Sequence, residues 1–340
     1  MRVFVRLLVV PLALSVYLIV AGGPSIAAAS SPASSPDAGL IASPQAQAAD
    51  APAEFSIDIR GFFDNAFSFI AAWFSSRRPP TPPGGDTVPP GYFTAKDGQQ
   101  VYLALGDSLA VSTGVANATN GYVSRFHGYL ERESGHPYGL VNMGVHGESS
   151  TSIQGRQLEA AIDHIRLLRD DGDPATRVSV VTLDLGGNDI LYHLASDECR
   201  GMPWGAQCLR GVNRALNEFA VNFDSVVSQI AAELEPGAEF YIMTVYNPFD
   251  LGLDLAVEDL SNEVVGQLNA VIRSTAEAHG ATVADAFAVM NGRANVWTHI
   301  LRGDIHPTDR GFQALAYSLV EAHRQRAASE TRMANAVNAP

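Results

Sequence analysis

Positive charge is scarce in this 340-residue chain. Its 22 Lys and Arg residues stand against 36 Asp and Glu residues, which gives a formal net charge of −14. Because binding to nucleic acid depends on cations that neutralise phosphates, this balance argues against a nucleic-acid partner. It also disfavours an anionic membrane or a polyanionic substrate. Charged residues of both signs make up only 17% and hydrophobic residues 46%, so the chain has ample material for a buried core.

Long hydrophobic runs are lacking apart from the N-terminus. There Arg2 and Arg6 lead into an apolar stretch, Leu7 to Val20, which Pro11 interrupts and which Ala27-Ala28-Ala29 follows. This pattern predicts a secretory signal peptide over residues 1–29, and hence a secreted or extracytoplasmic protein. The alternative is an uncleaved membrane anchor, since the stretch is near the lower length limit for spanning a bilayer.

Cysteine is almost absent, with Cys199 and Cys208 only. They lie in one segment rich in Gly and Pro, and an oxidising compartment favours their pairing. We therefore predict a Cys199–Cys208 disulfide that closes a loop. Because neither a Cys-x-x-Cys spacing nor a neighbouring pair of histidines accompanies them, we expect no metal site.

Residues 30–90 lack the pattern of a folded domain. Residues 30–53 have almost no large apolar side chain, which predicts a flexible linker. An aromatic amphipathic segment, 55–74, follows; it is either a helix packed on the next domain or an interfacial helix that contacts a membrane surface. A proline-rich spacer ends at Pro90.

Residues 91–326 alternate between strand and helix patterns and are predicted to form the folded domain, with a flexible tail over 327–340. Expected strands cover 101–105, 139–142, 178–185, 240–245 and 281–284; expected helices cover 121–133, 158–168, 212–234, 260–275 and a segment after the N-cap candidate Thr308. This alternation predicts an α/β fold with a central parallel sheet and helices on both faces.

Four short motifs fall at predicted strand ends or in loops able to reach them, where ligands of such sheets bind. They are Gly106-Asp107-Ser108-Leu109, Asn142-Met143-Gly144, Gly186-Gly187-Asn188-Asp189 and Asp304-Ile305-His306-Pro307.

These motifs contain the groups that an activated serine needs. Ser108 is the candidate nucleophile and His306 the candidate base. The backbone N–H groups of Ser108 and Gly144 and the side-chain amide of Asn188 are candidate oxyanion donors. Taken singly, Gly144 also fits a turn residue and Asn188 a helix cap.

In their order along the chain, the four motifs resemble those of the GDSL family of SGNH hydrolases, over roughly residues 100–325. The resemblance implies a flavodoxin-like three-layer α/β/α sandwich of the SGNH hydrolase type and ester hydrolysis through an acyl-enzyme. It assigns Ser108, Gly144, Asn188 and His306 the roles above, and it implies no metal or organic cofactor.

The fourth motif departs from the family pattern. The family usually has an aspartate three positions before the histidine, where this chain has Gly303; its acid is Asp304, two positions before. We expect Asp304 to orient His306 as the third member of the triad. The alternative is a backbone carbonyl in that role.

The sequence thus predicts a secreted serine esterase or lipase-like hydrolase that acts on a small-molecule, lipid or carbohydrate ester. The alternatives are a non-catalytic binding or cell-surface module of the same fold, and an acyltransferase. The insertion from Leu191 to Arg210, with Trp204, is predicted to form a wall of the pocket. The sequence does not indicate acyl chain length, alcohol or oligomeric state.

Overall fold

The computed structural model describes residues 99–170, 172–173, 175–199, 205–253 and 255–337. The predicted signal peptide, the linker with its 55–74 segment, the first residues of the predicted domain and Trp204 lie outside the described residues. Within the described residues, no helix combines the length and the apolar composition that crossing a membrane requires.

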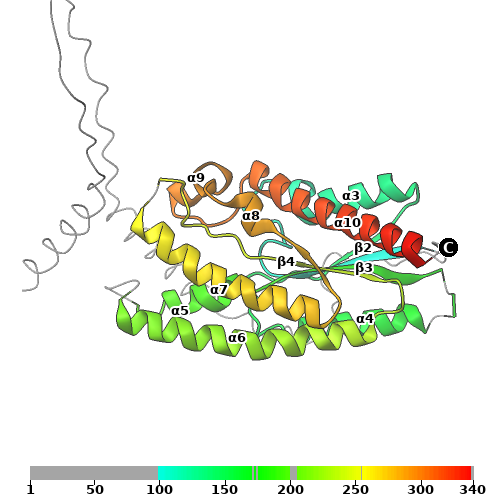
Figure 1. Cartoon of the computed structure of the whole chain (residues 1–340), viewed down its shortest axis with the longest axis horizontal. Coiled ribbons are helices and arrows are strands. Elements are labelled where there is room, and N and C mark those ends of the chain that lie inside the picture. Colours follow the sequence, from blue (N-terminus) through cyan, green and yellow to red (C-terminus); the bar gives the residue numbers. More distant parts are fainter. Residues whose placement is uncertain (1–98, 171, 174, 200–204, 254, 338–340) are drawn as a thin grey trace, which may run out of the picture. The chain divides into compact units, whose positions relative to one another are not determined.

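A five-stranded parallel sheet forms the centre of the domain (Figure 1). Its strands are β1 (Gln100–Gly106), β2 (Gly139–Asn142), β3 (Arg177–Asp184), β4 (Glu239–Met243) and β5 (Thr282–Ala284), in the spatial order β2-β1-β3-β4-β5. This is the flavodoxin-like strand order, in which ligands bind beyond the carboxyl ends of the strands. The predicted fold class is confirmed.

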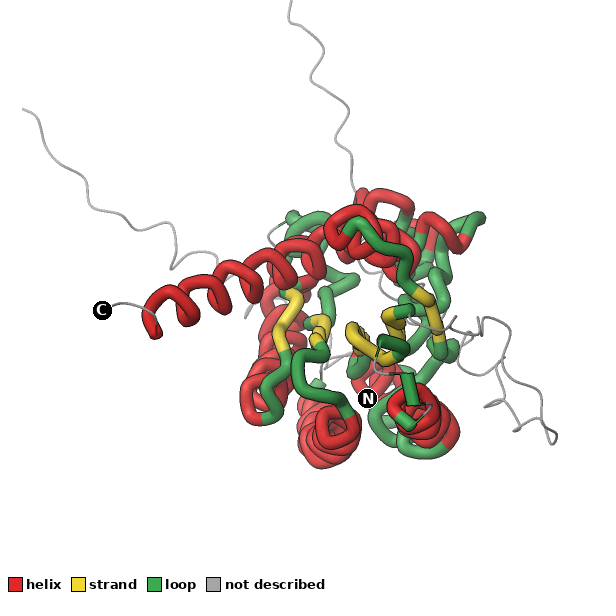
Figure 2. Tube along the Cα trace, turned by 90° about the vertical axis from the view of Figure 1, so that its right-hand side faces the viewer, coloured by secondary structure: helices red, strands yellow, loops and turns green. Residues whose placement is uncertain are grey.

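Helices cover both faces of this sheet (Figures 1 and 2). On one face lie α4 (Arg156–Arg169), α5 (Gly187–Leu194), α6 (Ala206–Glu233) and α7 (Ala256–Ala278). On the other lie α3 (Tyr122–Ser134), α8 (Ala286–Met290) and α10 (Asp309–Val337). The short elements η1 (Ala118–Asn120), α9 (Ala294–Trp297) and η2 (Ile300–Arg302) lie in the connections.

Burial on both faces explains why the central strands are apolar runs. In β3 all residues after Arg177 are buried, and neighbouring apolar side chains such as Val180 and Val181 pack into the two opposite cores. The layer of α4 to α7 has a mainly aliphatic core, in which Phe219 and Phe223 stack. The opposite core is richer in aromatic rings, with Tyr102, Phe126 and Tyr241 in edge-to-face contacts.

The tail from residue 327, which the sequence predicts to be flexible, is helical as far as Val337, and α10 leads out toward the C-terminus in Figure 2. Ala, Glu, Arg and Met in this segment are strong helix formers. An ion pair between Arg326 and Glu330, one turn apart at 3.0 Å, adds support. Residues 327–337 show no apolar periodicity, so the sequence pattern did not indicate this helix.

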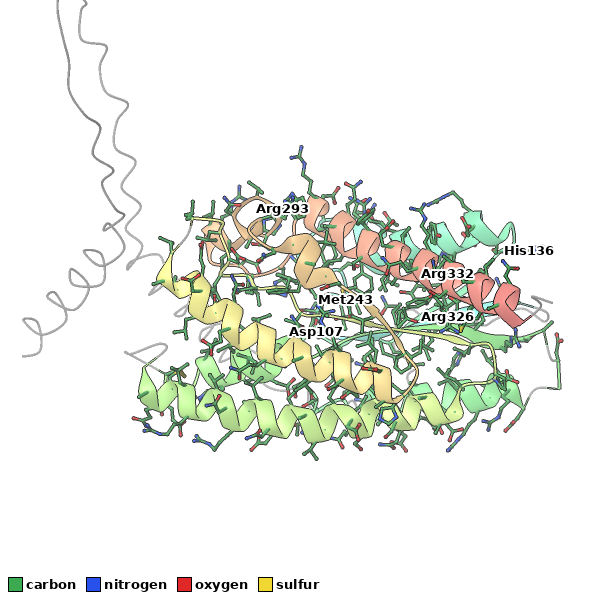
Figure 3. The ribbon with its side chains drawn as sticks, viewed as in Figure 1. Asp107, His136, Met243, Arg293, Arg326 and Arg332 are labelled. Atoms are coloured by element: carbon green, nitrogen blue, oxygen red, sulfur yellow. A yellow bond between two sulfur atoms is a disulfide. The ribbon has the colours of Figure 1, made fainter. Side chains whose placement is uncertain are left out.

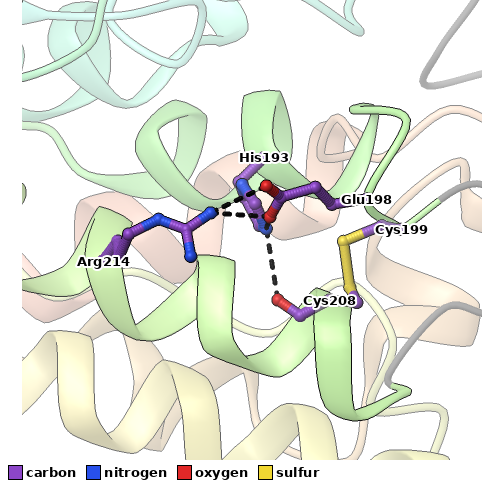
Figure 4. The surroundings of a disulfide bond; sticks show 5 residues. All are labelled: His193, Glu198, Cys199, Cys208 and Arg214. Carbon is purple, nitrogen blue, oxygen red and sulfur yellow. Dashed lines mark hydrogen bonds and ion pairs between the residues drawn. A yellow bond between two sulfur atoms is a disulfide. The ribbon is translucent and has the colours of Figure 1, made fainter.

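The Cys199–Cys208 disulfide is present, with Cα atoms 4.5 Å apart (Figure 4). Cys208 lies in the first turn of α6 and not in a loop, because α6 begins at Ala206. Nε2 of His193 on α5 hydrogen-bonds the carbonyl of Cys208 at 3.1 Å, and Arg214 pairs with Glu198 at 2.7 Å. The disulfide therefore joins the start of α6 to the turn that follows α5. The predicted insertion is shorter than expected at both ends, because α5 extends to Leu194 and α6 begins at Ala206.

Candidate active site

Ser108 lies in the turn after β1, at the carboxyl edge of the sheet, and the residue is buried, with 6% of its surface exposed. The turn needs Gly106, whose φ is +143°. A Cβ atom there would lie 2.2 Å from Oδ1 of Asp184 on β3. The side chain of Gln157 on α4 holds the same glycine, accepting from its N–H at 2.8 Å and donating to its carbonyl at 3.0 Å.

The structure brings Ser108, His306 and Asp304 together, although 198 positions separate the serine from the histidine. Oγ of Ser108 lies 2.9 Å from Nε2 of His306, and Nδ1 of His306 lies 2.5 Å from Oδ1 of Asp304. His306 is 3% exposed. These distances are those of a nucleophile, a base and a group that orients the base.

The loop that carries Asp304 and His306 explains the shifted position of the acid. An isolated bridge pairs Thr298 with Pro307, and the N–H of His299 donates to the carbonyl of His306 at 2.9 Å, which closes the loop. Gly303 takes φ +80° at the end of η2. The position three before the histidine, where the family usually has its acid, is therefore occupied here by a glycine that turns the chain. Asp304 then accepts from the backbone N–H of His306 at 3.0 Å as well as from its ring.

The charge on Asp304 determines the histidine tautomer. Burial by itself would raise the pKa of Asp304, but its hydrogen bonds with His306 and the nearby imidazole hold that pKa below its usual range. An ionised carboxylate can only accept a hydrogen bond, so Nδ1 of His306 carries a proton. Nε2 is then the ring nitrogen that can accept the hydroxyl proton of Ser108, 2.9 Å away.

The three predicted oxyanion donors differ in what they already bond. The N–H of Gly144 donates to Oδ1 of its neighbour Asn142 at 3.0 Å. Nδ2 of Asn188 donates to Oδ2 of Asp107 at 2.9 Å and to the carbonyl of Glu148 at 2.8 Å. For the N–H of Ser108 the described residues provide no acceptor.

Gly144 is a point of close approach between two loops. A Cβ atom at this position would lie 2.6 Å from Cβ of Ala110, in the turn after Ser108. Asn142 also donates to the carbonyl of Ala110 at 2.7 Å. The second motif therefore packs directly against the turn that carries Ser108.

Two buried carboxyl groups lie beside Ser108. Asp107 accepts from the N–H of Leu109 at 2.9 Å, a contact that stabilises the turn. Asp184 accepts from the N–H of Asp107 at 3.1 Å and from the hydroxyl of Tyr122 on α3. An acid inside an otherwise apolar strand was the only sequence signal for Asp184.

Burial is the first cause of the raised pKa of both groups. It raises the pKa of Asp184 far above its usual range, and the neighbouring Asp107 adds to the effect. It also raises the pKa of Asp107, against the opposing hydrogen bond from Leu109. The pair therefore retains protons at a pH where exposed aspartates are ionised.

Asp189 joins α5 to the loop that follows Gly144. It accepts from the backbone N–H of Ser150 at 3.0 Å and from its hydroxyl at 2.5 Å. Burial, opposed by these bonds, raises its pKa to about 6. Asp189, next to Asn188 in the third motif, is thus hydrogen-bonded to the loop that follows the second motif.

Within the described residues, the one group with the spacing of metal ligands is His193 with Cys199 and Cys208. Both sulfur atoms belong to the disulfide and are not thiolates. This donor set does not fit a metal ion.

Comparison with known proteins yields one family. Residues 104–314 match the GDSL-like lipase/acylhydrolase family. The chain is 24% identical over 223 residues to the spore germination lipase LipC of Bacillus licheniformis, covering 64% of this chain and 93% of that protein. It is also similar in fold to the lipase Lip_vut3 from a goat rumen metagenome, with a TM-score of 0.51, 22% identity, and coverage of 66% of this chain and 97% of that one.

Proposed function

The chain belongs to the GDSL-like lipase/acylhydrolase family, and we propose that it hydrolyses carboxylic esters through an acyl-enzyme formed on Ser108. The observation that carries this proposal is the contact series from Ser108 through His306 to Asp304, at 2.9 and 2.5 Å.

In the first step, Oγ of Ser108 attacks the ester carbonyl carbon while its proton passes to Nε2 of His306. Asp304, ionised and hydrogen-bonded to Nδ1, stabilises the imidazolium that forms. When the tetrahedral intermediate collapses, the bond to the alcohol oxygen breaks and His306 returns the proton to that oxygen. Water then attacks the acyl-enzyme, His306 takes a proton from the water, and the carboxylic acid leaves as Ser108 is protonated again.

The oxyanion of the intermediate needs donors at the same edge of the sheet. The N–H of Ser108 is open to a substrate. The N–H of Gly144 becomes a donor to the substrate oxygen when that oxygen replaces its present acceptor, Oδ1 of Asn142. The amide of Asn188 becomes a donor when the substrate oxygen replaces either Oδ2 of Asp107 or the carbonyl of Glu148. Each exchange trades one hydrogen bond for a charge-assisted one, which favours the charged intermediate over the neutral ester.

The proposal includes export. A signal peptide over 1–29 would deliver the chain to a compartment where cysteines oxidise, and the Cys199–Cys208 disulfide supports this. We assign residues 30–90 to a linker and the catalytic domain to the residues from 91 onward.

The test is hydrolysis of p-nitrophenyl esters by the full chain and by Ser108→Ala. We expect kcat to fall by at least about 10⁴-fold, because the attacking atom is lost. Ser134→Ala, at an exposed position of α3, is the matched control and should retain full activity.

A fluorophosphonate probe gives an independent readout. It should label the wild-type protein and the Ser134→Ala control at one site, and leave Ser108→Ala unlabelled. No turnover of any ester, with Ser108 inert to the probe, would contradict the proposal and favour a binding module. Transfer of the acyl group to an added alcohol at the expense of hydrolysis would identify an acyltransferase.

A further inference from the structure

A cavity opens beside the catalytic groups, with about 800 Å³ of space when its open mouth is included. Ser108, His306 and Asn188 contribute to its lining, and so do Asp107 and Met243, both of which lie in the interior in Figure 3. The rest of the wall comes from α5, from the segment after β4 and from α7. The cavity thus begins at the residues of the proposed reaction and continues between α5 and α7.

Away from the catalytic groups, the wall is hydrocarbon. Its side chains include Leu191, Leu194, Phe249, Val264, Val265 and Leu268. None of them is more than 9% exposed, so the space between them is narrow and largely screened from bulk water. Such a surface gains free energy from an apolar ligand that displaces water.

The polar side chains in this part of the wall are already paired with protein groups. Nδ2 of Asn247 donates to Oγ of Ser261 at 2.7 Å, and its Oδ1 accepts from the N–H of Phe249 at 2.9 Å. The hydroxyl of Ser261 donates to the carbonyl of Glu258 at 3.1 Å. A hydroxylated ligand such as a sugar would find few open partners here, whereas an alkyl chain needs none.

We infer that this cavity holds the acyl chain of the substrate, and that the enzyme prefers esters of medium-chain fatty acids to acetyl esters. The inference rests on the proposed function. The acyl half stays attached to Ser108 until water arrives, while the alcohol half must leave first. A walled cavity suits the half that stays, and a solvent-facing exit suits the half that leaves. An acetyl group, with a single methyl, would contact little of the hydrocarbon wall.

The expected size of the preference follows from burial. Each methylene transferred from water into an apolar wall contributes about 0.8 kcal/mol, or about fourfold in kcat/KM if the gain is realised in the transition state. Four methylenes separate acetate from hexanoate. Because part of the chain stays in contact with water near the mouth, we expect a gain of at least about thirtyfold.

The first experiment measures kcat/KM of the full chain in two substrate series. In one, p-nitrophenyl esters run from acetate through butyrate and hexanoate to octanoate. In the other, the acyl group stays acetyl and the alcohol lengthens from ethyl to hexyl. Chain-length dependence in the first series only is the expected result. Equal rates for acetate and hexanoate would overturn the inference, and dependence in the alcohol series only would overturn the acyl assignment.

The second experiment narrows the cavity. Val265→Trp on α7 should lower the ratio of kcat/KM for hexanoate to that for acetate by at least about tenfold, because the indole occupies the space of several methylenes. Val221→Trp, the same change at a position of α6 that is 72% exposed, is the matched control and should leave the ratio unchanged.

Leu191→Trp narrows the cavity from α5 and gives a second, independent change in case Val265→Trp folds poorly. Thermal unfolding and probe labelling of Ser108 show whether each variant is folded. An unchanged ratio in folded variants would overturn the inference. If the wild-type protein hydrolyses no ester at all, the proposed function is contradicted. Failure of the inference and failure of the proposed function therefore give different results.

Discussion

The two ends of the sheet differ in their acids, which are buried at the carboxyl end and partly buried at the amino end. At the carboxyl end, burial raises the pKa of Asp107 and of Asp184. At the amino end, Glu239 begins β4; burial by itself would raise its pKa too, but its hydrogen bonds with His323 and Tyr241 hold that pKa below its usual range. Nδ1 of His323 lies 2.9 Å from Oε2 of Glu239.

The partners of these acids differ as well. Glu239 has an imidazole that can carry positive charge, and Arg326 lies near enough to add to it. Asp184 has a peptide N–H, a phenol and a second carboxyl group. At that end, His306 is hydrogen-bonded to Asp304 and Ser108. The imidazole at the amino end is thus hydrogen-bonded to the acid of the strand, while His306 at the carboxyl end has Asp304 and Ser108 as partners.

In the proposed mechanism, the largest expected effect comes from removing the carboxylate of Asp304, which is hydrogen-bonded to His306. Asp304→Asn should lower kcat by about 10³- to 10⁴-fold, because the amide has no charge to stabilise the imidazolium and can hold the ring in the wrong tautomer. Ester hydrolysis at pH 8 measures the loss. Asp163→Asn, an exposed position on α4, is the control. Near-normal kcat in Asp304→Asn would instead assign the orienting role to a backbone carbonyl.

Asp184→Asn tests the uncompensated end. Because the folded state raises the pKa of Asp184, its contribution to stability is present below the unfolded pKa of about 3.9 and is lost as pH rises through the folded value. Asn keeps an acceptor for the N–H of Asp107 and can donate through its amide to the hydroxyl oxygen of Tyr122, without this loss. We expect the variant to gain stability over the wild type as pH rises, by at least about 1 kcal/mol at pH 8, or about 3 °C in Tm.

Thermal unfolding of both proteins from pH 4 to pH 9 measures this gain, again with Asp163→Asn as the control. A difference in Tm that stays constant across this range would show that Asp184 ionises in the folded protein as it does in the unfolded chain. The comparison between the two ends would then fail.

Glu239→Gln tests the compensated end and should have the smallest effect. The lowered pKa of Glu239 means that its contribution to stability is present above the unfolded pKa and is lost as pH falls through the folded value. We expect the variant to be less stable than the wild type by about 1 kcal/mol at pH 7, since a charge-assisted hydrogen bond is lost. The deficit should shrink in acid, opposite in sign to the trend at Asp184. A deficit that persists unchanged at pH 3 would point to packing and not to charge.

Elements with a clear local sequence pattern were predictable, whether that pattern is a helical period or a short apolar run between turn residues. Residues 139–142 were expected as a strand and form β2 with the same bounds, since a short apolar run between turn residues has few other uses. The helix α5 was missed, because its eight residues follow Gly186-Gly187 and offer barely two turns of periodicity. The short helices α8 and α9 were missed for the same reason.

The chain's own sequence determined the order of strands and helices, the four motifs at the carboxyl edge and the cysteine pair, because each depends on residues close together in the chain or on a local period. Only the tertiary structure decided which groups surround Ser108. Tyr122 and Asp184 are 62 positions apart, and Asn188 is 81 positions from Asp107. No local pattern encodes such pairs, since they form only when parallel strands bring their carboxyl ends to one edge. For the same reason the apolar cavity between α5 and α7 became visible only after the two helices had packed on one face of the sheet.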